Sequence, residues 1–122
     1  MRKTLAVMTV AGLAAVGGGT AAASGGSGPC AAQRATVKTE RLTVRADDAR
    51  IRSDHATIRA DRDQLRVDRR SGNTAAVTAD KAKLKTDRAK LAADRKQRRT
   101  DRKQLRADRR ALRQCRRANR KT

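Results

Sequence analysis

The side chains that could carry out chemistry are few and widely spaced in this sequence of 122 residues. His55 is the single histidine, and the two cysteines, Cys30 and Cys115, lie far apart in the chain. A catalytic or metal-bound histidine needs partner side chains at characteristic spacings, and none surrounds His55. The sequence also contains no phosphate-binding loop, nucleophile elbow or zinc motif. We therefore expect no enzyme, no bound metal, no cofactor and no small-molecule substrate.

Acidic residues recur with a spacing of seven, which raises the question of a row of cation sites. Lys83 lies three residues after Asp80 and four residues before Asp87, and both spacings are typical of ion pairs on one helix. No segment has the glycine and the terminal glutamate of a calcium loop. We interpret the carboxylates as partners of basic side chains. The periodic acids are Glu40, Asp47, Asp54, Asp61 and Asp68, followed by Asp80, Asp87, Asp94, Asp101 and Asp108.

An apolar residue stands three positions before each of these acids, with one exception, Arg98. A spacing of seven equals about two turns of α-helix, so it places the apolar side chains in a narrow stripe along one side. Ala, Arg, Lys, Leu and Gln fill most other positions and favour helix. The stripe residues are Val37, Val44, Ile51, Ile58 and Leu65, then Val77, Leu84, Leu91, Arg98, Leu105 and Leu112.

The spacing is interrupted once, at residues 71–74. Gly72 suits the left-handed residue that ends a helix, and Asn73 or Thr74 can cap the next one. We predict an all-α fold: a long antiparallel two-helix hairpin over residues 30–115, coiled-coil-like and closed by a disulfide. Helix 1 is expected at about 31–70, the turn at 71–74, helix 2 at about 75–115, and a basic tail at 116–122.

A register in which facing residue numbers add to 142 brings the two stripes together, for example Ile58 against Leu84. It also places acids opposite basic side chains, although Val44 then meets Arg98 and Asp48 meets Asp94. The expected charged neighbours include Asp54 with Arg88, Asp61 with Lys81, and His55 with Asp87.

Cys30 and Cys115 flank the predicted hairpin, and the midpoint between them falls in the turn. An even number of cysteines in an exported chain favours a disulfide. We predict the pair Cys30–Cys115 within one chain, with disulfides between chains as the alternative.

The N-terminus has the pattern of a secretory signal peptide over residues 1–23. Arg2 and Lys3 precede an apolar run, and Ala21–Ala23 offer a small-residue cleavage site. Residues 24–29 form a Gly/Ser linker. We expect a protein that is secreted or located in the periplasm or cell envelope.

Positive charge is the strongest functional signal, because 32 basic residues outnumber 12 acidic ones and the formal net charge is +20. Arg contacts phosphate or carboxylate in a planar, bidentate way, and with no aromatic residue the chain cannot stack on bases. We expect arginines projecting all round helix 2 to bind anionic polymers or surfaces: envelope glycopolymer, anionic lipid or nucleic acid. The candidate residues are Arg95, Arg98, Arg99, Arg102, Arg106, Arg109, Arg110, Arg113, Arg116 and Arg117.

Two other function classes are consistent with the sequence. A line of small residues could accept another helix, which would suit self-association or an envelope scaffold or chaperone-like protein that binds protein partners. A cationic membrane-active protein is the third class. The small residues are Ala46, Ala49, Ala56, Ala60, Ala79, Ala82, Ala89 and Ala93.

Overall fold

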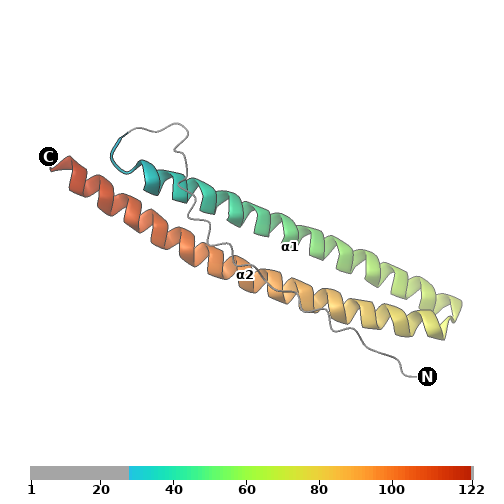
Figure 1. Cartoon of the computed structure of the whole chain (residues 1–122). Coiled ribbons are helices and arrows are strands. Elements are labelled where there is room, and N and C mark those ends of the chain that lie inside the picture. The colour runs from blue at the N-terminus through green and yellow to red at the C-terminus, as the bar shows by residue number, and fades with distance from the viewer. Residues whose placement is uncertain (1–27, 122) are drawn as a thin grey trace, which may run out of the picture.

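The computed structural model describes residues 28–121, which form two long helices packed side by side as an antiparallel hairpin (Figure 1). Helix α1 is Ala31–Ser71 and helix α2 is Thr74–Arg120. The predicted all-helical hairpin is confirmed. The predicted signal peptide and most of the predicted linker lie outside the described residues. Among the described helices, none is both long enough and apolar enough to cross a membrane.

The turn between the helices follows from two residues. Gly72 adopts φ 71°, a left-handed conformation that suits glycine, and its N–H donates to the carbonyl of Arg69 at 3.2 Å. Asn73 then caps α2, because its side-chain oxygen accepts a hydrogen bond from the Ala76 N–H at 3.1 Å. These two contacts end one helix and begin the next within a few residues.

Helix α2 extends to Arg120 instead of ending near residue 115. The residues beyond Cys115 are arginines, an alanine and Asn119, and most of them favour helix. The Asn119 side chain donates to the carbonyl of Cys115 at 2.8 Å, four residues earlier. The expected basic tail is therefore mostly the last turn of α2.

Apolar side chains with a spacing of seven form the interface between the helices. They divide into two clusters separated at the level of Arg98, the polar exception in the stripe of α2. The cluster near the disulfide contains Cys30, Val37, Val44, Leu105 and Leu112, with Cys115 packed against it. The cluster near the turn contains Ile51, Ile58, Leu65, Leu84 and Leu91, with Val77 packed against it.

Cys30 and Cys115 form a disulfide, with their Cα atoms 5.8 Å apart. The pairing predicted within one chain is confirmed. Cys30 lies seven residues before Val37, and Cys115 lies seven residues after Asp108. The bond therefore occupies the next position along the same interface and closes the hairpin opposite the turn.

The predicted register is wrong by about three residues. Lys83 Nζ contacts Asp61 Oδ1 at 2.9 Å and Arg98 Nη1 contacts Asp48 Oδ1 at 3.1 Å, so facing numbers add to 144 and 146 instead of 142. The turn and the disulfide impose this register, since both are centred between residues 72 and 73. Ile58 consequently lies at a level between Leu84 and Leu91 and packs in one cluster with both.

Candidate anion-binding face

Basic residues follow two rows on each helix. The inner row contains the residues four positions after each stripe residue, and the outer row contains those one position after it. On α2 the inner row is Lys81, Arg88, Arg95, Arg102, Arg109 and Arg116, and the outer row includes Lys85, Arg99, Arg106, Arg113 and Arg120. On α1 the inner row is Arg34, Arg41, Asp48, His55, Arg62 and Arg69, and the outer row is Lys38, Arg45, Arg52, Arg59 and Arg66.

Cross-helix contacts show that the inner rows of α1 and α2 flank the same side of the interface. A nitrogen of the Arg95 guanidinium lies 3.2 Å from Nε2 of His55. Arg102 Nη2 lies 3.6 Å from Asp48 Oδ1. All four residues belong to the inner rows. Because neighbouring rows on a helix lie side by side, the two inner and two outer rows make one continuous surface, which we name the basic face.

The opposite side of the hairpin has a different composition. Its rows contain mainly Ala, Thr, Ser and Gln, together with three basic residues, Arg50, Lys83 and Lys90. Each of these three contacts a carboxylate: Arg50 contacts Asp47, Lys83 contacts Asp61 and Lys90 contacts Asp54. We name this side the neutral face. The expectation of arginines all round α2 is therefore corrected, because none of the ten candidate arginines lies on the neutral face.

The middle of the basic face pairs internally. Arg98 reaches Asp48 at 3.1 Å, Arg102 also approaches Asp48, and Arg95 contacts His55. The predicted contact of His55 with Asp87 is wrong, because His55 contacts Arg95, which shares its side of the interface, while Asp87 is one of the periodic acids directed into the interface. This paired middle divides the inner rows into a segment near the disulfide and a segment near the turn.

The ten arginines proposed from sequence occupy three places. Arg98 lies in the interface, with 30% of its side chain exposed, and pairs with Asp48. Arg110 and Arg117 lie on the outer edge of α2, beyond the outer row. Of the exposed arginines, Arg106, Arg109, Arg110 and Arg113 together line an open hollow of about 370 Å³. The seven that lie on the basic face are Arg95, Arg99, Arg102, Arg106, Arg109, Arg113 and Arg116.

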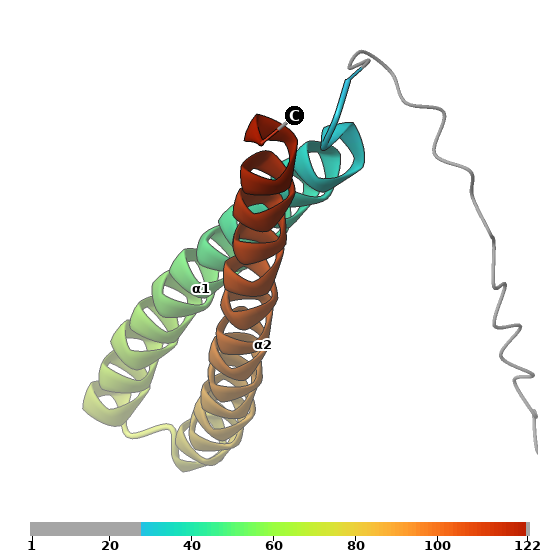
Figure 2. The same cartoon turned by 90° about the vertical axis from the view of Figure 1, so that its left-hand side faces the viewer.

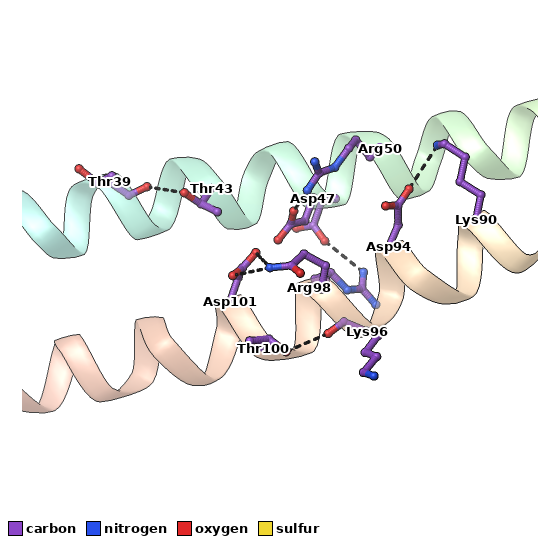
Figure 3. Close-up of polar contacts among 12 residues, drawn as sticks. Thr39, Thr43, Asp47, Arg50, Lys90, Asp94, Lys96, Arg98, Thr100 and Asp101 are labelled. Carbon is purple, nitrogen blue, oxygen red and sulfur yellow. Dashed lines mark hydrogen bonds and ion pairs between the residues drawn. The ribbon is translucent and has the colours of Figure 1, made fainter. Parts of the chain in front are cut away.

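The periodic acids do not neutralise the basic face, because they are directed into the interface. Asp47 is completely buried, and Asp54 and Asp61 are buried as well. Figure 3 shows Asp47 directed from α1 toward α2, where Asp101 points back toward it. Among the twelve acidic residues, only Asp48 lies on the basic face. The uneven distribution of charge thus follows from the positions at which the sequence places its acids.

Carboxyl groups also meet each other across the interface, a contact that was not predicted from the sequence. The carboxyl group of Asp47 lies close to that of Asp101, and the carboxyl group of Asp61 lies close to that of Asp87. Burial, together with the Asp101 carboxyl, raises the pKa of Asp47 above its ordinary value. The contacts follow from a spacing of seven shared by both helices, so the correct register would have revealed them.

Lysines on the neutral face form ion pairs with some of these carboxylates. The hydrogen bond to Asp61 raises the pKa of Lys83, and the bonds to Asp54 and Asp94 raise the pKa of Lys90. Within residues 28–121, no group of three or more His, Cys, Asp or Glu side chains is arranged to hold a metal ion. The arrangement can attract anions on one side, while most of its carboxylates are directed into the interface.

No protein-family model, curated protein or solved structure matches this chain.

Proposed function

We propose that this protein is an exported, non-enzymatic module that binds anionic polymers or surfaces through its basic face. The observation that carries the proposal is the segregation of charge between the two sides of the hairpin. Four rows rich in Arg and Lys lie together, while ten of the twelve acids occupy the interface. A basic surface that served solubility alone would have no need for this segregation.

The chemistry of the face favours phosphate or carboxylate groups without recognition of a sequence. Guanidinium groups bind such anions in a bidentate way. Binding releases counterions from the polyanion, so the affinity falls steeply as salt rises. Without aromatic side chains, the protein cannot stack on bases. The proposed binding is therefore electrostatic and tolerant of the order of groups along the ligand.

The disulfide supports the export part of the proposal. Such bonds persist in oxidising compartments and are rare in reducing ones. In an envelope or extracellular setting, the available polyanions are anionic glycopolymers, lipid headgroups and released nucleic acid. The helices are held as a hairpin without a large core, which suits a module that presents a surface instead of a pocket.

A salt series tests the proposal. The oxidised full chain would be titrated with polyphosphate, duplex DNA and vesicles containing phosphatidylglycerol at low and at moderate salt. For an interface of six to ten phosphate contacts, we expect the affinity to fall by about 10³-fold or more between about 50 mM and about 200 mM salt. Absence of binding to every one of these anions at low salt would overturn the proposal.

A pair of matched variants locates the binding. The face variant carries Arg45→Gln, Arg59→Gln, Arg99→Gln and Arg113→Gln, all on the outer rows. The edge variant carries Lys96→Gln, Lys103→Gln, Arg110→Gln and Arg117→Gln, on the outer edge of α2. Each variant loses the same charge from exposed helix positions. We expect the face variant to bind more weakly than the edge variant; equal losses would contradict a role for the basic face.

A further inference from the structure

We infer that the basic face lies flat on the headgroup surface of an anionic lipid bilayer, with the neutral face directed away from it. This inference rests on the proposed function and names the class of ligand. It follows from the shape of the charged surface, from the position of the exposed apolar residues, and from the internal pairing of the inner rows.

The charges of the basic face form a two-dimensional array. Residues of one row are seven positions apart, which corresponds to about 10 Å along a helix. The axes of packed helices are about 8–10 Å apart, and α1 and α2 run side by side over their length (Figures 1 and 2). The four rows therefore cover the width of both helices. A flat surface can contact the inner and outer rows of both helices at once. A single polymer chain follows one line along the hairpin and contacts only the rows next to that line.

The line that a single chain would follow is interrupted. Such a chain would lie between the inner rows, along the interface of α1 and α2. Midway along that line, Asp48 and His55 from α1 already contact Arg98, Arg102 and Arg95 from α2. The outer row of α1, by contrast, is basic at Lys38, Arg45, Arg52, Arg59 and Arg66 without a break. This distribution favours a broad surface over a linear polymer.

The basic face has no large apolar side chain with which to enter the bilayer. The exposed large apolar residues of the described chain are Leu42 and Val67, each 55% exposed. Leu42 belongs to the outer edge of α1, and Val67 lies on the side of the neutral face. Helices that insert into the interface use Trp, Phe or Leu on the buried side. Contact is therefore limited to headgroups, through the attraction of Lys and Arg to anionic lipid.

The absence of tryptophan from the chain offers a direct test of orientation. Ala92 and Ala93 are adjacent and both exposed, but Ala92 lies in the outer row of the basic face and Ala93 lies on the neutral face. Ala92→Trp and Ala93→Trp would each supply the sole indole. With vesicles containing phosphatidylglycerol, we expect a blue shift and protection from acrylamide for the indole at position 92 only. Pure phosphatidylcholine vesicles should leave both unchanged.

The outcomes separate this inference from the proposed function. Binding to polyphosphate or duplex DNA without binding to anionic vesicles would overturn the bilayer inference and leave the proposed function standing. An equal response of the two indoles would overturn the orientation. Release of a trapped dye at low protein-to-lipid ratio would show insertion and overturn adsorption at the headgroups. Failure to bind any of the anions would overturn both proposals.

Discussion

The carboxyl groups of Asp61 on α1 and Asp87 on α2 lie close together across the interface, and each shifts the pKa of the other. Two ionised carboxylates at this separation repel each other, and a proton shared between them relieves the repulsion. Asp68 with Asp80 and Asp54 with Asp94 make the same contact. One oxygen of Asp61 and one of Asp87 are buried without a hydrogen-bond donor when both acids are ionised. A shared proton removes that unfavourable burial.

The Asp61–Asp87 pair predicts a pH dependence of stability. The hydrogen bond to Asp61 and burial raise the pKa of Asp87 above 3.8, while bonds to Asp87 and Lys83 lower that of Asp61. The contribution of Asp87 to the stability of the hairpin is fully present below pH 3.8 and is lost as the pH rises through its raised pKa. The contribution of Asp61 to the stability of the hairpin is present above pH 3.8 and is lost as the pH falls through its lowered pKa. The pair therefore stabilises the hairpin most at a pH near the ordinary aspartate pKa of 3.8, and less at neutral pH.

Asp87→Asn tests this dependence, because an amide donates the hydrogen bond without needing a proton. We expect the variant to unfold at a higher urea concentration than the parent at neutral pH, with the difference shrinking as pH falls toward 4. Asp63→Asn serves as the control, since the Asp63 side chain is 70% exposed and pairs with Arg66 alone. A variant at position 87 that is less stable at every pH would contradict the shared proton.

The hairpin itself could be predicted because the sequence repeats its pattern on both sides of one break. Stripe residues such as Ile58 and Leu84 are buried where the spacing of seven places them. Gly72 and Asn73 identify the turn through their own backbone and capping chemistry. The cysteines are centred on the same turn and form the expected disulfide. The turn residues, which are local signals, and the cysteine pair, which is a long-range signal, therefore predicted the same hairpin.

The register and the charge distribution could not be predicted in the same way. A spacing of seven is satisfied equally well by a shift of seven, and the observed level of Ile58 falls between the two choices, near both Leu84 and Leu91. Lysine side chains are long enough to reach acids that are not directly opposite, as Lys83 reaches Asp61. The basic face appears only when the inner rows of both helices are placed on one side of the interface, which depends on contacts such as Arg95 with His55.

Arg98 separates the two apolar clusters, and its replacement by leucine should join them. Burying a leucine stabilises by about 1.5–3 kcal/mol, whereas a partly exposed ion pair such as Arg98–Asp48 contributes about 0–1 kcal/mol. We expect Arg98→Leu to raise the free energy of unfolding by about 1 kcal/mol, measured by urea denaturation at neutral pH. Arg102, which lies 3.6 Å from Asp48, is still present in the variant to pair with that carboxylate. A loss of stability would show that the ion pair outweighs the apolar contact.

Ile58 tests how much the narrow interface contributes to stability. This residue is 5% exposed and belongs to the cluster near the turn. Truncation of a buried isoleucine to alanine costs about 2–5 kcal/mol, and we expect Ile58→Ala to fall at the lower end because a two-helix interface can close around the gap. Leu42→Ala is the matched control at a residue that is 55% exposed, with an expected change below about 0.5 kcal/mol. Equal thermal shifts would contradict the assignment of the core.

Reduction of the Cys30–Cys115 disulfide should loosen one end of the hairpin before the other. The two cysteines are 85 residues apart, and the chain-entropy estimate for such a loop is about 4.5 kcal/mol. Cys30 belongs to the cluster with Val37 and Leu112, so that cluster loses both a covalent link and part of its packing. The cluster near the turn depends on contacts between residues close in sequence, such as Leu65 and Val77, and keeps them. Hydrogen exchange of a Cys30→Ser, Cys115→Ser variant should therefore show lost amide protection around residues 31–44 and 105–115 and retained protection around residues 58–84, with a lower melting temperature. Uniform loss of protection would show that the hairpin unfolds as one unit, and unchanged protection would show that the disulfide is not needed to hold the helices together.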